Sequence, residues 1–493
     1  MKDILLIIPV FLPLLFGGLL VLCKGFDKLD CRRITGYVAL LNSLMIWGIL
    51  LGGIGRKGLM LFRITDRLNI FFRLDGLGMV FAGLISFLWP LAVLYASEYM
   101  EEDRHQRSFF GFYTMTYGAT AAIAMAGNIT TLYVFYEMMT LVTFPLVLHY
   151  KNQESREASI VYLVYSFGGA TCAFIGMIVM IVTEGSGIFR YGGFLQHVGL
   201  NADQIHFLLI IYVVSFFGFG VKAALFPLHG WLPRVSVAPT PVTALLHAVA
   251  VVKAGAFAIL RLTYYCYGPE MLRGTFAQKV AAFFVMATIF YGSSMAVKEI
   301  HFKRRLAYST ISNLSYILLG AVMMCPAGLM AALTHMVFHA LMKITAFFCA
   351  GAVMKKADKH YIYELDGLGY RMPVTFVCFT IAALSLTGTP LFCGFISKWF
   401  IARGALAGEG RLGIIAIGVM MVSALLTAIY MLTVVVRAFY PGKDFDPESI
   451  SGISDPTWRM LLPITLISFL IIFFGIYSGP LIGFFEQIAK GVI

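Results

Sequence analysis

The sequence contains few charged residues. Only 13% of its 493 residues are Asp, Glu, Lys or Arg, whereas 60% are hydrophobic. Soluble domains carry about 25% charged residues, which face water at the surface. The composition therefore excludes a soluble enzyme and a disordered chain. It also indicates that the net charge of +12 reflects the basic loops of a membrane protein and not the binding of nucleic acid.

Cysteine motifs are also missing. The eight cysteines form no C-x-x-C pair, so iron–sulfur and zinc sites of the usual spacing are not expected. They are interpreted as small core residues, and we expect neither a metal ion nor a cofactor in this chain. The N-terminus lacks the basic region and the cleavage site of a signal peptide, so residues 4–22 are expected to remain as a first membrane span.

Long hydrophobic runs fill most of the sequence. A bilayer crossing needs about 20 apolar residues, and the composition allows about 14 such crossings. The runs are continuous, which excludes a transmembrane β-barrel. The predicted fold class is therefore an all-α, polytopic membrane protein. The predicted spans are 4–23, 35–53, 76–97, 109–126, 129–149, 158–182, 207–226, 240–264, 278–297, 304–322, 326–353, 373–403, 413–437 and 459–482.

Basic loops predict the orientation. Loops after odd-numbered spans hold more Lys and Arg than the other loops do. The sharpest clusters are Lys298, Lys303, Arg304 and Arg305, and Lys355, Lys356 and Lys359. Since basic loops stay in the cytoplasm, both termini are expected outside, in a bacterial or archaeal cell membrane. Residues 56–73 are basic as well but lie on the opposite side.

Two predicted spans are interrupted. The first break, at residues 221–227 with Pro227, falls at the end of the seventh span, and the second, at Gly388 and Pro390, falls in the twelfth. Proline removes a backbone hydrogen bond, which in lipid is tolerated only beside protein or water. Matching breaks in two halves of a chain indicate a transport site. Prolines 90 and 145 also lie in spans, so a proline by itself does not establish one.

The offset between the two breaks predicts the domains. Five spans separate them, and an odd offset inverts the second unit relative to the first. We therefore expect two inverted five-span repeats. The expected domains are 1–108 (helices 1–3), 109–264 (helices 4–8), 265–437 (helices 9–13) and 438–493 (helix 14).

Five ionisable residues lie deep in the predicted spans. They are Glu137, Lys222, Lys253, Lys343 and Lys398. Each costs about 2.5–3.5 kcal/mol at a helix centre, so five cost roughly 12–17 kcal/mol, as much as the net stability of about 5–15 kcal/mol of a typical protein. Snorkelling to the interface cannot relieve all five, because most lie far from a loop. They must be paired, hydrated or neutral, and Lys222 is the expected partner of Glu137.

Histidines extend this set. His335, His339 and Lys343 lie four residues apart and form one stripe on a helix face, which favours a proton path. No acid or cysteine nearby completes a metal site. His247 and Lys253 lie about 120° apart on a regular helix, so water or a distortion would have to link them. The hydroxyl and amide groups of residues 308–315 either hold a file of water or pack helices together.

The run Lys222-Ala-Ala-Leu-Phe-Pro-Leu-His-Gly-Trp-Leu-Pro233, with residues 238–247 after it, is a distinctive motif. It resembles the signature of the antiporter-like proton-pumping subunits shared by respiratory complex I, Mrp-type cation/proton antiporters and membrane-bound energy-converting hydrogenases. The resemblance covers nearly the whole chain. That family has an acid on span 5 and lysines on a broken span 7 and on span 8, with a lysine or glutamate on a broken span 12. The matching residues are Glu137, Lys222, Lys253 and Lys398, and His335 and Lys343 fit the family's central connection.

The resemblance implies fourteen helices with two inverted half-channels and proton translocation driven by a redox module elsewhere in a complex. The chain would have no redox chemistry of its own. Its expected partners are other membrane subunits, a hydrogenase or a quinone or ferredoxin oxidoreductase, and the lipid bilayer. Transport of Na⁺ by a subunit of an Mrp-type Na⁺/H⁺ antiporter, or by a stand-alone secondary cation transporter, is the alternative. A quinone-handling enzyme is disfavoured, since cysteine motifs and paired haem ligands are missing.

Overall fold

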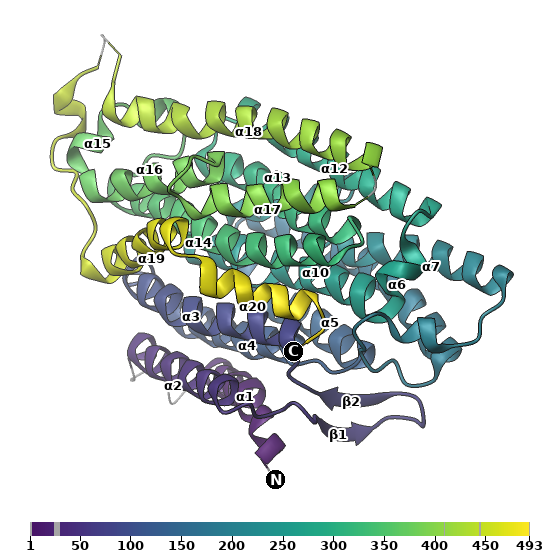
Figure 1. Cartoon of the computed structure of the whole chain (residues 1–493). Helices are drawn as coiled ribbons and strands as arrows, with labels where there is room; N and C mark the ends of the chain where they lie inside the picture. The colour runs from purple at the N-terminus through teal and green to yellow at the C-terminus, as the bar shows by residue number, and fades with distance from the viewer. Residues whose placement is uncertain (1, 24–29, 409, 443–444, 493) are drawn as a thin grey trace.

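A computed structural model of the chain describes residues 2–23, 30–408, 410–442 and 445–492. It consists of packed, roughly parallel helices with one small β-hairpin at an end of the bundle (Figure 1). The helices of the first half are α1 (Ile8–Leu22), α2 (Cys31–Leu51), α3 (Gly76–Tyr99), α4 (Gln106–Ala124), α5 (Ile129–Val147), α6 (Gln153–Glu184), α7 (Ala202–Gly220), α8 (Trp231–Arg234), α9 (Thr240–Ala248) and α10 (Val251–Arg261). Those of the second half are α11 (Pro269–Leu272), α12 (Phe276–Lys298), α13 (Phe302–Val322), α14 (Pro326–Ala357), α15 (Leu368–Arg371), α16 (Pro373–Thr387), α17 (Cys393–Ala407), α18 (Gly410–Phe439), α19 (Trp458–Ile476) and α20 (Gly479–Ala489).

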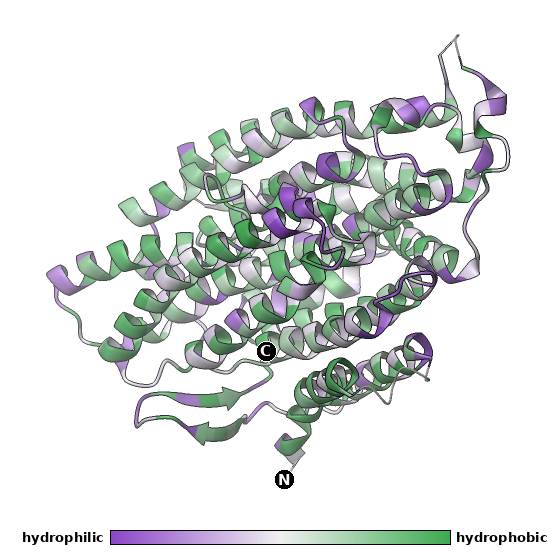
Figure 2. Ribbon diagram, turned by 180° about the vertical axis from the view of Figure 1, so that it is seen from behind, coloured by the Kyte–Doolittle hydropathy of each residue, from purple (hydrophilic) through white to green (hydrophobic). Residues whose placement is uncertain are grey.

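Apolar residues run along the helices, whereas hydrophilic residues gather at helix ends and in loops (Figure 2). Within the described residues, eleven helices are long and apolar enough to cross a membrane, so the chain is a polytopic membrane protein. Two further helices, α4 and α13, fall on predicted spans but contain more polar residues, and the twelfth predicted span is divided between α16 and α17. The central helix α14 is almost completely enclosed, since every residue from Gly328 to Met354 except Val337 is buried.

The β-hairpin was not expected from the sequence. Strands β1 (Leu59–Arg63) and β2 (Asn69–Phe72) pair in antiparallel fashion within residues 56–73, a segment expected to be a loop. Aromatic and aliphatic side chains suit such a half-buried pair. The hairpin is fixed to the bundle at the start of α5, where Thr131 Oγ1 accepts a hydrogen bond of 2.8 Å from the amide of Phe71.

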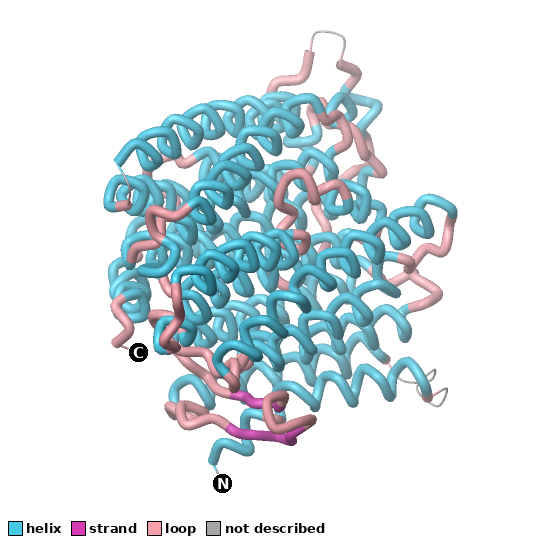
Figure 3. Tube along the Cα trace, turned by 90° about the vertical axis from the view of Figure 1, so that its right-hand side faces the viewer, coloured by secondary structure: helices cyan, strands magenta, loops and turns pink. Residues whose placement is uncertain are grey.

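Both ends of the described chain lie at the hairpin end of the bundle (Figures 1 and 3). Near the N-terminus, Asp3 accepts a hydrogen bond of 3.0 Å from the amide of Gly55, just before β1. Near the C-terminus, the hydroxyl of Tyr191 donates a hydrogen bond to the carbonyl of Ala489, the last residue of α20.

Helices break where the sequence predicts, and at one further place. Helix α7 ends at Gly220 and is followed by a turn that contains Pro227, while α16 ends at Thr387 before Gly388 and Pro390. By contrast, α3 and α5 continue through their prolines. The unpredicted break lies between α9 and α10, where the backbone of residues 249–250 leaves helical geometry.

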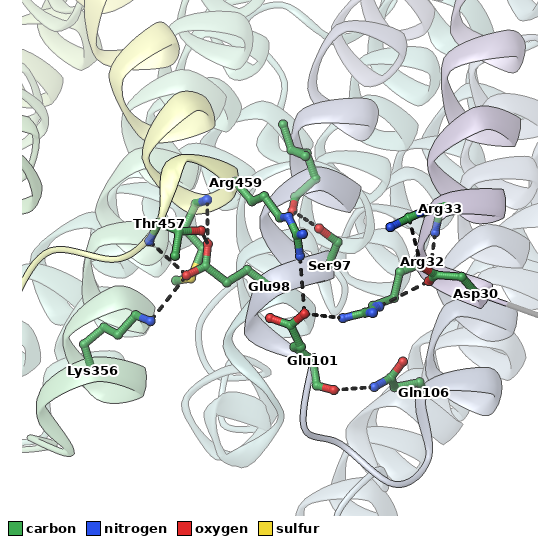
Figure 4. A network of polar contacts seen from close by, with 12 residues as sticks. Asp30, Arg32, Arg33, Ser97, Glu98, Glu101, Gln106, Lys356, Thr457 and Arg459 are labelled. Atoms are coloured by element: carbon green, nitrogen blue, oxygen red, sulfur yellow. Dashed lines mark hydrogen bonds and ion pairs between the residues drawn. The ribbon is translucent and has the colours of Figure 1, made fainter.

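A network of polar contacts joins three helices at the end opposite the hairpin (Figure 4). The buried carboxylate of Glu98, on α3, accepts hydrogen bonds from the amides of Thr457 and Met460, at 2.9 and 3.2 Å. These amides begin α19, so a side chain from another helix satisfies the free N–H groups of its first turn. Lys356, at the end of α14, lies 3.4 Å from the same carboxylate. Glu98 thus ties α3, α14 and α19 together.

Replacing Glu98 with alanine should weaken this junction. The Glu98→Ala change leaves buried amides and an ammonium group without an acceptor, which costs about 3 kcal/mol. We expect a lower melting temperature of the protein in detergent, measured by circular dichroism. Glu102→Ala is the control, because the Glu102 side chain is 82% exposed. Equal melting temperatures for the two variants would show that Glu98 is dispensable for the junction.

Candidate functional site

Glu137 and Lys222 form the expected pair. Glu137 lies in the middle of α5, and Lys222 lies in the turn directly after α7 ends. The Lys222 Nζ is 3.2 Å from Glu137 Oε1 and also donates to the carbonyl of Tyr136, and it lies 3.4 Å from the centre of the Tyr136 ring. The lysine side chain is 1% exposed and that of the glutamate 19%. A buried ammonium group is thus stabilised by a carboxylate, a carbonyl and an aromatic face.

The broken end of α7 packs against α10. A Cβ atom on Gly255 would clash with the main chain of Lys222 and Ala223, so only glycine allows this approach. The indole of Trp231 donates a hydrogen bond of 2.8 Å to the carbonyl of Val221, which satisfies one acceptor released by the break. The geometry fixes Lys222 next to the helix that carries Lys253.

Lys253 contacts the stripe of α14. Its Nζ bonds to Nδ1 of His339, and both side chains are completely buried. His339 Nε2 has no hydrogen-bond partner among the described residues. The ring of His335 stacks on that of His339, with centroids 5.5 Å apart. A lysine and two imidazoles therefore lie next to one another in a row, and each of them can hold a proton.

His335 connects α14 to α13 and α17. One ring nitrogen, Nε2, is 3.0 Å from the carbonyl of Asn313, so it carries a hydrogen. The other, Nδ1, is 2.9 Å from Ser397 Oγ, which in turn donates to the carbonyl of Gly394 at 3.0 Å. A protonated His335 donates to Ser397 while Ser397 keeps its bond to the Gly394 carbonyl. A neutral His335 accepts the hydrogen of Ser397 instead, and the bond to Gly394 is then lost.

Lys398 occupies the break between α16 and α17. Its Nζ donates to the carbonyls of Leu386 and Thr387, at 2.7 and 2.9 Å. These are two of the last acceptors of α16, which ends where Gly388 adopts a φ of +95°. A cation at the C-terminus of a helix interacts favourably with the helix dipole. The break therefore supplies the carbonyl acceptors that hold Lys398. The side chain of Lys398 is partly exposed at the surface of the bundle.

Two predicted site residues lie beside this set. Lys343 is fully buried on α14 and donates to the carbonyl of Leu306 at 3.1 Å, and no acid of the described part of the chain pairs with it. His247 precedes the break between α9 and α10, packs on the ring of Phe347, and has no hydrogen-bond partner among the described residues. The distortion that the spacing of His247 and Lys253 requires is thus present, but the structure records no direct contact between them.

Three buried cations were missed or misplaced from the sequence. Arg261, at the end of α10, is fully buried and binds Asp75 with both terminal guanidinium nitrogens, one at 2.7 Å. An arginine within an apolar span, with an acid just before the third span, was an available signal. Lys303 and Arg305 were expected in a cytoplasmic loop. They are buried in the first turns of α13 instead, where Lys303 bonds to the carbonyl of Ala238 and Arg305 to that of Tyr430.

Several known proteins resemble this chain in sequence or in fold. A family model described as NADH:quinone oxidoreductase/Mrp antiporter, TM, matches residues 126–429, and one described as NADH-Ubiquinone oxidoreductase (complex I), chain 5 N-terminus, matches residues 63–110. The chain is 30% identical over 425 residues to NADH-quinone oxidoreductase subunit N of Desulforudis audaxviator, which covers 83% of this chain and 81% of that protein.

Two further similarities extend the comparison. The chain is 28% identical to the putative antiporter subunit mnhA2 of Staphylococcus haemolyticus over 93% of its own length, but it spans only 61% of that protein. Its fold matches a chain of the membrane-bound sulfane sulfur reductase, an archaeal respiratory membrane complex, with a TM-score of 0.85 and 22% identity over 98% of this chain and 97% of that chain. On the family model and the subunit N similarity, the chain belongs to the NADH:quinone oxidoreductase/Mrp antiporter family of membrane subunits.

Proposed function

We propose that the chain is the proton-translocating, antiporter-like subunit of a redox-driven ion-pumping complex in a bacterial or archaeal cell membrane. The observation that carries this function is the ionisable row, which comprises Glu137, Lys222, Lys253, His339, His335 and Lys398. Its two ends are partly exposed and its four central members are buried. A row of this kind suits relay between groups better than binding of one solute in one pocket.

Protons would move along the row in steps. A proton is taken up near Lys222, and the carboxylate of Glu137 controls whether that lysine keeps or releases it. When the pair loosens, the proton passes by water to Lys253 and then to the imidazoles of His339 and His335, with Lys343 and His247 beside them. Lys398 releases it on the other side. The Lys253–His339 bond and the His335–Ser397 bond support the central steps.

The row favours H⁺ over Na⁺. Alkali and alkaline-earth cations bind oxygen ligands. Glu137 is the only carboxylate of the row, and its other members are amines and imidazoles. Nitrogen groups of this kind hold protons but are poor ligands for Na⁺. The similarity to a putative antiporter subunit keeps a second candidate, a subunit of an Mrp-type Na⁺/H⁺ antiporter.

The architecture proposed with this function has fourteen crossings. Helix breaks after Gly220 and Thr387 support two inverted repeats, 109–264 and 265–437, flanked by 1–108 and 438–493. The basic clusters support a cytoplasmic location for the end that carries Glu98, with both termini outside.

Neighbouring subunits are part of the proposal. A carboxylate and a lysine partly exposed at membrane depth, such as Glu137 and Lys398, are costly unless another protein or water covers them. Membrane subunits on both sides, and a hydrogenase or a quinone or ferredoxin oxidoreductase as the redox module, would fit. The proteins that resemble the chain are named as components of an oxidoreductase, an antiporter and a respiratory complex.

Reconstitution tests this function. Vesicles with the whole complex should translocate protons when the electron donor is oxidised, and vesicles with the purified chain alone should move neither H⁺ nor Na⁺ down an imposed gradient. Cation uptake by the chain alone would identify a stand-alone transporter. Sodium-dependent proton movement by a complex without redox activity would identify the Mrp-type antiporter instead.

A further inference from the structure

Lys253, Phe257 and Arg261 form a stripe along α10. They follow one another at intervals of four residues, so each lies about 6 Å further along nearly the same face of the helix. All three side chains are completely buried. Lys253 belongs to the ionisable row, whereas Arg261 binds Asp75, which lies between β2 and α3. The stripe therefore leads from the ionisable row towards the hairpin end of the bundle.

Arg261 is enclosed by one carboxylate and three aromatic rings. Both of its terminal nitrogens donate to the carboxylate of Asp75. The ring centres that surround its Cζ belong to Phe189, Phe257 and Tyr265, at 4.8, 5.0 and 4.6 Å. Its Nε has no hydrogen-bond partner among the described residues. Since arginine does not release its proton in a protein, Arg261 is a fixed positive charge inside the bundle.

A polar cavity lies next to Arg261, at the hairpin end. Its volume is about 370 Å³, and Phe189, which packs on Arg261, is part of its wall. Arg73, the residue directly after β2, lines the cavity as well and donates to the carbonyl of Phe189. The other ionisable side chains of the wall are Glu184, Arg190 and His197. Arg261 thus lies between the cavity and the part of α10 that carries Lys253.

The charges around Arg261 do not cancel. Arg73 lies two residues before Asp75 and within electrostatic range of both Asp75 and Arg261. One carboxylate therefore serves two guanidinium groups. The cavity adds Arg190 and Glu184, one charge of each sign. The cluster keeps one positive charge in excess, which repels any proton that approaches it.

Helix packing by itself does not account for this arrangement. The Arg261–Asp75 pair joins α10 to α3, because Asp75 is the N-cap of α3 and accepts from the amide of Gly78 at 3.0 Å. A buried ion pair is often no more stabilising than apolar side chains of similar volume. A second arginine beside the pair adds a charge that the junction does not need.

We propose that Arg261 and Arg73 form an electrostatic barrier, which closes α10 towards the hairpin end and directs a proton on Lys253 to His339. The proposal rests on the proposed function. Lys253 is bonded to Nδ1 of His339 on one side and faces the excess positive charge on the other. Water that enters the cavity cannot carry a proton past Arg261, because the hydrated proton is itself a cation. Membrane pores that exclude protons use an arginine in the same way.

Variants that change the charge and keep the approximate size test this barrier. Arg261→Gln and Arg73→Gln each remove the excess charge and leave a polar side chain, whereas Arg261→Lys keeps it. The double variant Arg261→Gln with Asp75→Asn breaks the ion pair but leaves the excess charge on Arg73, and asparagine still caps α3. Arg437→Gln is the control, because Arg437 also pairs with an aspartate but is 40% exposed, so that water screens its charge.

The measured quantity is the decay of an imposed pH gradient across vesicles with the whole complex, without electron donor and corrected for protein-free vesicles. A unit charge about 12 Å from Lys253, the rise of eight helical residues, slows passage of a second one about tenfold at an effective dielectric constant of about 20. The decay should therefore be about tenfold faster for Arg261→Gln and for Arg73→Gln, per assembled complex. Arg261→Lys, the double variant and Arg437→Gln should retain the gradient like the wild type.

The outcomes separate the barrier from the proposed function. If Arg73→Gln and an assembled Arg261→Gln both hold the gradient, the charge closes nothing and the barrier is wrong. If the double variant leaks as fast as Arg261→Gln, the pair acts by packing, which also contradicts the barrier. Arg73 is partly exposed, so Arg73→Gln should assemble and decide the matter even where Arg261→Gln does not. Wild-type vesicles that hold the gradient but do not pump would contradict the proposed function alone.

Discussion

Replacing Glu137 with glutamine should abolish proton translocation by the assembled complex. Glutamine keeps the shape of the side chain and an oxygen that can accept from Lys222 Nζ, now 3.2 Å away, but it removes the negative charge. Lys222 can then no longer alternate between a paired and a released state. Since a positioned acid or base contributes about 10²–10⁴-fold to a proton-transfer rate, we expect a loss of more than about 100-fold. Proton uptake driven by the electron donor in vesicles measures it.

The partner variant and a control complete this experiment. Lys222→Ala should give the same loss, together with less assembled complex, because removal of one partner of a buried pair costs about 3–5 kcal/mol. Glu102→Gln alters a carboxylate that is 82% exposed and should pump normally. Wild-type pumping by either Glu137→Gln or Lys222→Ala would contradict the role of the pair.

Replacing Lys253 with leucine should separate the two halves of the ionisable row. Lys253 bonds to Nδ1 of His339, and among the described groups of the row it is the one that links α10 to α14. Leucine suits the apolar surroundings of Lys253 but leaves Nδ1 of His339 without its partner, which costs about 1–3 kcal/mol, so translocation is compared per assembled Lys253→Leu complex. Translocation should fall by about 100-fold or more, because the proton has no carrier between Lys222 and His339.

An exposed lysine gives the matched control for this variant. Lys279, on α12, is exposed, and Lys279→Leu should leave translocation unchanged. The assembled complex is quantified in both cases by gel electrophoresis under native conditions. Normal translocation by an assembled Lys253→Leu complex would mean that the proton bypasses the Lys253–His339 contact.

The sequence predicted the main pair because energy restricts the choice. A glutamate within an apolar span must find a cation, and Lys222 lies next to a helix break. The stripe of His335, His339 and Lys343 follows equally from the helical repeat, and all three are buried on α14.

Other partners could not be predicted, since they are main-chain atoms or residues distant in sequence. Lys398 is held by the carbonyls of Leu386 and Thr387, which carry no signal in the side-chain sequence. Arg261 pairs with Asp75, 186 residues away. The break between α9 and α10 has no proline or glycine at residues 249–250 that would mark it.

The sequence by itself determined that the chain lies in a membrane, where most of its spans run, and which buried charges need partners. These properties depend on hydrophobicity and on helical periodicity, which are local. Only the tertiary structure decided that His339 meets Lys253, that Ser397 meets His335, and that Ser423 joins hydroxyls of three helices. Such contacts depend on how separate helices pack, and helix packing is set by the combined shape of many side chains and not by any one segment.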